Sequence, residues 1–182
     1  CVLALDNAVM PAAVGYDINC GMRVIATDVP ADRVDLRQLA HSISRDVPLG
    51  EGHDNIRLSW AGLEEVLAGG VASLPDVATR PDTPGHRAWN SLDPGEIERD
   101  RERIEAGGSL PGQPAAVSEH ARKRARDQLA TLGGGNHFIE LQRVESIDDQ
   151  ASADAFGLFV GQLLVMIHSG SRGLGHQVGG DY

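Results

Sequence analysis

The 182 residues are enough for one domain, or one and a half, with a hydrophobic core, and 41% hydrophobic and 23% charged residues are ordinary shares for a soluble globular protein. A net charge of −10 disfavours a general nucleic-acid binder, which normally carries a basic excess. The apolar runs, such as 157–167, are too short to cross a bilayer, so we expect a cytoplasmic protein with no signal segment and no membrane contact.

In chain order, apolar and β-branched runs predict strands at 2–5, 21–29, 137–144 and 162–168. Helical patterns, some of them opened by an Asp or Ser cap, predict helices at 32–44, 59–68, 96–108, 118–130 and near 152–157. The segment 73–95 holds four prolines and is typical of an extended connection. Strands and helices mix without a regular βαβ rhythm, so we predict an α+β fold with mixed or antiparallel strands and peripheral helices.

One predicted helix, 118–130, carries a local excess of positive charge. Four cations lie within five positions: Arg122, Lys123, Arg124 and Arg126. The favoured interpretation is a solvated helix face, and the alternative is a patch that faces phosphate groups. Net charge alone does not decide between the two.

The first stretch with chemical potential is VGYDINCGMR, residues 14–23, in which Asp17 and Cys20 share one loop. A lone loop cysteine in a cytosolic chain is free, catalytic or metal-bound. A carboxylate and a thiolate at this spacing can reach one cation, a thiolate can bridge two, and this donor pair suits Zn, Mn, Fe or Co. The alternative is an Asx turn at Asp17 and an inert, buried Cys20.

The second stretch is LGGGNHFIEL, residues 132–141. Its consecutive glycines let the backbone approach an anion and turn N–H groups toward it. An alternating strand would then place His137 and Ile139 on one face and Asn136, Phe138 and Glu140 on the other. The first face could carry a metal ligand, while an amide, a ring and a carboxylate suit a purine nucleotide. The alternative is a flexible joint followed by a core histidine.

The third stretch is VMIHSGSRGLGHQV, residues 165–178, where an apolar strand ends at His168. Small residues then expose backbone N–H groups beside Arg172, which can clamp a phosphate through two hydrogen bonds. We interpret His176 as a helix-face residue or a support for the ligands, with a third metal ligand as the alternative. Asp17, Cys20, His137 and His168 all lie at strand ends near glycine, which predicts one shared site.

In this order, the three stretches resemble the motifs of the RtcB family of GTP-dependent RNA ligases, and SEHARKRARDQLATLGGGNHFIEL resembles the run into that family's central motif. The resemblance covers most of the chain and is loosest at 46–110. It implies one partial RtcB-like catalytic domain over 1–182, with site motifs at 14–23, 132–141 and 165–178. The first residue is not methionine and the last motif ends close to Tyr182, so we expect an N-proximal portion of a longer protein, truncated at both ends.

The resemblance implies an enzyme that joins RNA 3′-phosphate or 2′,3′-cyclic phosphate ends to 5′-hydroxyl ends in tRNA splicing or RNA repair. It implies GTP, two Mn²⁺ ions and a histidine–GMP intermediate. One Mn²⁺ would be held by Asp17, Cys20 and His137, and the other by Cys20 and His168. The implied nucleotide site consists of Asn136, Phe138, Ile139, Glu140 and Arg172. The expected partners are RNA and GTP, and an accessory protein is a further candidate.

One departure from the family limits these implications. The family's guanylylated histidine and a further metal-ligand histidine lie beyond the third motif, and no histidine of this chain stands in their context. We therefore assign no catalytic residue and expect the 182 residues alone to be inactive. Two alternatives stay open: a two-metal RNA phosphohydrolase, because bridged metals also activate water, and a catalytically silent module that binds metal or nucleotide.

Overall fold

A computed structural model describes residues 4–10, 20–50, 56–80, 83 and 93–182. The chain divides into two compact units. The helical unit comprises residues 1–19, 54–130 and 171–182, and the sheet unit comprises residues 20–53 and 131–170. The sheet unit combines strands with helices, and the described elements of the helical unit are helices, so the predicted α+β fold with antiparallel strands and peripheral helices is confirmed.

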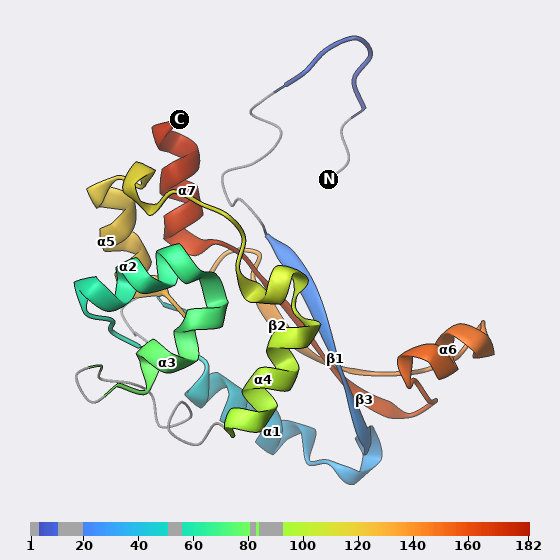
Figure 1. The fold of residues 1–182 in the computed structure, drawn as a ribbon. Coiled ribbons are helices and arrows are strands. Elements are labelled where there is room, and N and C mark those ends of the chain that lie inside the picture. Colours follow the sequence, from blue (N-terminus) through green and yellow to red (C-terminus); the bar gives the residue numbers. More distant parts are fainter. Residues whose placement is uncertain (1–3, 11–19, 51–55, 81–82, 84–92) are drawn as a thin grey trace. The chain divides into compact units, whose positions relative to one another are not determined.

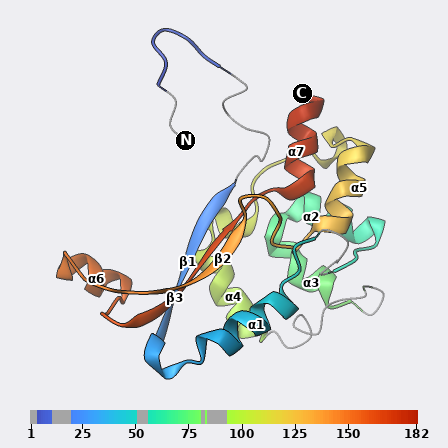
Figure 2. The same ribbon diagram turned by 180° about the vertical axis from the view of Figure 1, so that it is seen from behind.

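The sheet unit is built on three antiparallel strands in the order β1-β3-β2 (Figures 1 and 2). They are β1 (Gly21–Pro30), β2 (Phe138–Arg143) and β3 (Gln162–Ser169). The register places His168 of β3 between Met22 of β1 and Phe138 of β2. Because β3 is the central strand, the start of each edge strand meets its end.

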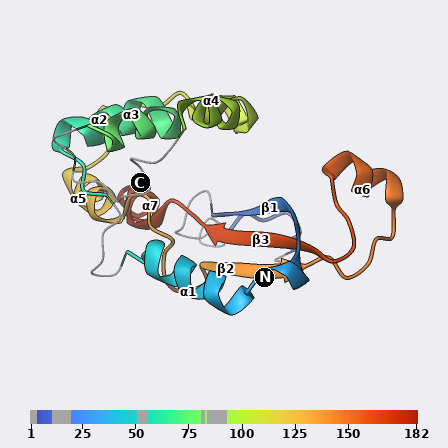
Figure 3. The ribbon, with the colours of Figure 1, turned by 90° about the horizontal axis from the view of Figure 1, so that it is seen from below.

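Two helices complete the sheet unit. After a 3₁₀ turn at Ala31–Arg33, α1 (Leu36–Asp46) begins at Asp35, whose side chain accepts from the Gln38 N–H at 3.0 Å. The shorter α6 (Gln150–Phe156) lies between β2 and β3 in the chain and projects away from the three strands (Figure 3). The helix predicted at 32–44 therefore exists, but Asp35 caps it rather than Asp32.

The helical unit contains five α-helices among the residues described. They are α2 (Trp60–Gly69), α3 (Leu74–Ala78), α4 (Pro94–Arg103), α5 (Glu119–Gln128) and α7 (Arg172–Asp181), with 3₁₀ turns at Gly70–Ser73, Glu105–Gly108 and Pro114–Ala116. Helices α5 and α7 lie side by side (Figures 1 and 2). The core is aliphatic and includes Ile56, Leu58, Leu63, Val66, Leu74, Val77, Ala78 and Ala125. None of the helices in the described ranges is long and apolar enough to span a membrane.

The two predicted serine caps of the helical unit are present. Ser59 and Ser118 accept from the backbone N–H groups of Gly62 and Ala121, each at 3.1 Å, which confirms the predicted starts of α2 and α5. Three expectations were wrong. The segment 73–95 contains α3, α7 (Arg172–Asp181) follows β3 where no helix was predicted, and Ala4 and Leu5 do not belong to a strand. Residues 2 and 3 of that predicted strand lie outside the described residues.

The cations of α5 are tied to their own unit. Arg122 forms an ion pair with Glu64, Lys123 pairs with Glu119 at 2.7 Å, and Arg124 donates to Gln177 at 3.3 Å. Arg126 donates to the Leu58 carbonyl at 2.7 Å and lies over the Trp60 ring. Arg122, Arg124 and Arg126 therefore link α5 to its neighbours, whereas Lys123 pairs within α5 and is 59% exposed, as expected of a solvated helix face.

Candidate metal centre

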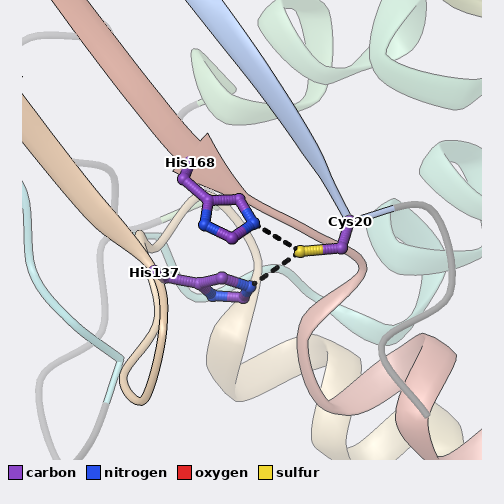
Figure 4. Close-up of side chains that lie close together, drawn as sticks. All are labelled: Cys20, His137 and His168. Carbon is purple, nitrogen blue, oxygen red and sulfur yellow. Dashed lines mark hydrogen bonds between the residues drawn. The ribbon is translucent and has the colours of Figure 1, made fainter. Parts of the chain in front are cut away.

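Three donor side chains from distant parts of the sequence meet in the sheet unit (Figure 4). The Sγ atom of Cys20 lies 2.8 Å from Nε2 of His168 and 3.5 Å from Nε2 of His137. The two imidazole rings meet edge to face, with centroids 5.3 Å apart. Cys20 is exposed and both histidines are half-buried, so a small cation can reach the donors from solvent.

The strand register explains why these residues converge. Cys20 directly precedes β1, His137 directly precedes β2, and His168 is the penultimate residue of β3. Since both edge strands run antiparallel to β3, their first residues lie beside its last ones.

The glycine stretch before His137 forms a turn rather than a strand. Gly133 and Gly135 have φ of 109° and 71°, a region that favours glycine. The hydroxyl of Ser169 at the end of β3 donates to the Leu132 carbonyl at 2.7 Å, and the His137 N–H donates to the Gly134 carbonyl at 3.4 Å. These bonds fix the turn that delivers His137 to the end of β3.

The donor set fits a divalent metal ion. The two distances from sulfur to nitrogen are shorter than the sum of a metal–sulfur and a metal–nitrogen bond, about 4.4 Å, so one ion can touch Cys20 and either histidine. One thiolate and two imidazoles suit Zn, Fe or Co, and a preference for Mn requires an added oxygen ligand. Asp17, the predicted source of that oxygen, lies outside the described residues.

Comparison with known proteins identifies the relatives of this chain. The family model described as tRNA-splicing ligase RtcB matches residues 1–182. The chain belongs to the RtcB family. The tRNA-splicing ligase RtcB of Thermococcus kodakarensis is 42% identical over 183 residues, which cover 98% of this chain and 35% of that protein. The protein of the same name from Aeropyrum pernix is 40% identical over 181 residues, covering 97% of this chain and 34% of the relative.

A third relative shows the same partial coverage. The tRNA-splicing ligase RtcB of Pyrococcus furiosus is 42% identical over 168 residues, which cover 90% of this chain and 16% of the relative. The chain thus spans about a third or less of the curated RtcB proteins that it matches. Membership in the RtcB family, predicted from the three motifs, is confirmed.

The nucleotide-site residues implied by the RtcB resemblance are distributed over both units. Phe138 lies on the same face as His168, with ring centroids 5.4 Å apart, and Glu140 is exposed two residues further along β2. Asn136 lies in the preceding turn, and Ile139 points to the other face of β2. Arg172 opens α7 in the helical unit, with a φ of 53°.

The predicted separation of a metal face from a nucleotide face was wrong. The alternation assumed that the strand includes Asn136 and His137, but β2 begins at Phe138. His168 and Phe138 consequently share one face of the sheet. Sequence reasoning also missed Gln142, whose amide donates to Glu140 at 3.0 Å, although the two-residue spacing along a strand signals such a contact. The interpretation of His176 as an exposed helix-face residue is confirmed.

Proposed function

We propose that the protein containing these 182 residues is a GTP-dependent RNA ligase that joins RNA 3′-phosphate or 2′,3′-cyclic phosphate ends to 5′-hydroxyl ends. One observation carries the proposal: in a chain of the RtcB family, Cys20, His137 and His168 meet within hydrogen-bonding distance at the ends of three strands. A cysteine thiolate and two imidazoles are common ligands of a divalent metal ion. A contact that only stabilises the fold would not require these three side chains.

The residues of this chain would hold two Mn²⁺ ions. Asp17, Cys20 and His137 would bind one and Cys20 and His168 the other, with the Cys20 thiolate between them. When bound, the ions neutralise the charge of a nucleoside triphosphate and orient its phosphates. The close approach of both Nε2 atoms to one sulfur supports a bridging role for Cys20.

The same face of the sheet would receive the guanine nucleotide. Phe138 offers an aromatic ring beside His168, and the exposed Glu140 carboxylate can accept from N–H groups of a guanine base. The amide of Gln142 holds that carboxylate in place. Asn136 and Arg172 would contact phosphate, whereas the side chain of Ile139, which the RtcB resemblance also assigns to this site, lies on the other face of β2.

The covalent step would use a histidine outside these 182 residues. Its nitrogen would attack the α-phosphorus of GTP, form a histidine–GMP bond and release pyrophosphate. The RNA 3′-phosphate would take the GMP from that histidine, and the 5′-hydroxyl would then displace GMP to form the phosphodiester. The cytoplasmic location and the accessory protein stay predictions.

Incubating the full-length protein with Mn²⁺ and GTP labelled at the α-phosphate tests the proposal. We expect acid-labile label on the protein, reduced at least 100-fold in Cys20→Ala and His168→Ala. The matched control is His41→Ala, an exposed histidine of α1 that the structure places outside the donor cluster. Release of phosphate from RNA 3′-ends without GTP would identify the phosphohydrolase instead, and metal binding with neither reaction would identify the silent module.

A further inference from the structure

Residues 144–161 form an insertion between β2 and β3 that we call the β2–β3 excursion; it contains α6. It carries four acidic residues, Glu145, Asp148, Asp149 and Asp154, and no lysine, arginine or histidine. It joins β3 at Gln162, whereas the donor cluster lies at the other end of that strand, beside Ser169. The excursion is therefore separate from the metal centre within the sheet unit.

The excursion exposes three large apolar side chains within five positions. Phe156 is 74% exposed, Val160 is 56% exposed and Phe159 is 37% exposed. Single apolar side chains on a surface are normal, but a group of them beside charged residues is typical of an interaction site. The four acidic residues of the excursion are exposed as well. The apolar group therefore follows a stretch of exposed carboxylates in the sequence.

A buried glutamine holds the exposed segment in one conformation. Gln162 is 1% exposed; its Nε2 donates to the carbonyls of Gly157 at 3.0 Å and Thr27 at 2.5 Å, and its Oε1 accepts from the Phe159 N–H at 3.0 Å. The Gly161 N–H also donates to the Val144 carbonyl at 2.8 Å, which closes the base of the excursion. The backbone that carries the apolar side chains is thus preorganised, which lowers the entropic cost of binding a partner.

We propose that the β2–β3 excursion is a docking site for a separate protein that presents an apolar groove lined by lysine or arginine. The four carboxylates repel RNA phosphates and attract cations, so charge complementarity favours a basic protein surface. A second copy of these 182 residues is disfavoured, because their net charge is −10 and the cations of α5 form contacts within their own unit. Phe156 at the end of α6 would anchor the contact.

A synthetic amphipathic peptide tests this inference. The peptide has lysines on one face and leucines on the other, and its binding to the full-length protein is measured. We expect saturable binding in fluorescence anisotropy that weakens with salt, and no binding of the matched peptide in which glutamate replaces lysine. Phe156→Ser should weaken binding about tenfold or more, the effect of one buried phenylalanine. Asp149→Asn with Asp154→Asn should weaken it and flatten the salt dependence.

Leu110→Ser is the matched control, because Leu110 is also an exposed apolar residue (66%) but belongs to the helical unit. This variant should bind the basic peptide with the same affinity as the native protein. Equal binding of the acidic peptide, or an unchanged affinity in Phe156→Ser, would overturn the proposal. A second measurement concerns the free site: Phe156→Cys should react with a maleimide at the rate of an exposed thiol. Slow labelling in the isolated full-length protein would mean that its own polypeptide covers the site, and it would also overturn the proposal.

Discussion

Cys20 and His168 are 148 positions apart in the sequence, yet the sulfur of one lies 2.8 Å from Nε2 of the other. Antiparallel pairing of β1 with β3 creates this contact, because Gly21 faces Ser169 and Met22 faces His168. The pairing of β2 with β3 adds His137 on the other side. The donor cluster is therefore a product of sheet register together with the turn that delivers His137.

Metal stoichiometry provides the first prediction. Cys20→Ala should lower the number of Mn²⁺ ions bound per full-length protein from two to one or none, because both proposed sites lose their shared thiolate. Equilibrium dialysis with metal analysis measures the number, and His41→Ala should leave it at two. Full occupancy in Cys20→Ala would refute the bridge.

The sequence allowed the prediction of most elements and of the residues that converge, but not of their geometry. Capping serines fixed the starts of α2 and α5, because a hydroxyl before an apolar pattern is a local signal. Helix α3 was missed because Pro75 looks like a helix breaker, although proline is favoured in a first turn. No bounds were predicted for α7 because its glycines favour a loop, although His176 was interpreted as a helix-face residue.

The register of the sheet could not be predicted, and the arrangement of the site depends on it. Nothing local to His168 indicates that Phe138 and Met22 will be its neighbours. The faces assigned to Asn136 and His137 were wrong for a related reason, since β2 begins at Phe138 and strand alternation does not apply to the two residues before it. The metal and nucleotide roles of these residues stay predictions.

Packing around Gly62 leads to a second prediction. A Cβ atom at this buried position would lie 2.7 Å from Cγ1 of Val77, so Gly62→Ala should lower the free energy of unfolding by about 1–3 kcal/mol. Gly180→Ala is the control within α7: no atom lies within 4 Å of the added Cβ, and helix propensity should raise stability by about 0.5 kcal/mol. Urea unfolding measures both, and a destabilised Gly180→Ala or a neutral Gly62→Ala would contradict the packing described.

The neighbouring cations Arg122 and Lys123 should differ in importance. The Arg122 side chain is 20% exposed, pairs with Glu64 and donates from Nε to the Val117 carbonyl at 2.9 Å, whereas Lys123 is 59% exposed and pairs only along its helix. Arg122→Ala should cost about 2 kcal/mol of unfolding free energy and Lys123→Ala about 0.3–0.5 kcal/mol. Urea titrations of the two variants test this difference, and equal losses would show that Arg122 acts only as a surface charge.

Gln162 should control the rigidity of the β2–β3 excursion. Gln162→Leu removes the partners of the Phe159 N–H and the Gly157 carbonyl, which should cost about 2 kcal/mol and speed hydrogen exchange at Phe159. Gln150→Leu in the same segment is the control, because the Gln150 side chain donates to exposed Asp154, and exchange at Phe159 should not change. Unchanged exchange in Gln162→Leu would show that other contacts hold the excursion.

The contact of Asp181 with α5 should make stability depend on acid. Hydrogen bonds from Ser118 at 2.6 Å and from Gln177 at 2.8 Å hold the pKa of Asp181 below its usual value of 3.8. Because the folded pKa is the lower one, the contribution is complete above the unfolded pKa and is lost as the pH falls through the folded pKa.

Asp181→Ala should therefore be less stable than the native protein near pH 7, and the gap should shrink as the pH falls below about 3.8. The free energies of unfolding of Asp181→Ala and of the native protein, measured from pH 7 to below about 3.8, test the prediction. Asp100→Ala on the exposed face of α4 is the control and should track the native curve. A gap that stays constant with pH would assign the loss to packing rather than to the carboxylate.

The central position of β3 has a consequence for the order of assembly. The strand is the last of the three in the chain, and β1 and β2 pair with it and not with each other. During synthesis, β1 and β2 therefore cannot pair with β3 until residues 162–169 have emerged from the ribosome. Contacts that close such long loops form slowly, and a metal ion that binds only the finished cluster would trap the paired sheet. Metal uptake would then mark the moment at which the nascent sheet is complete.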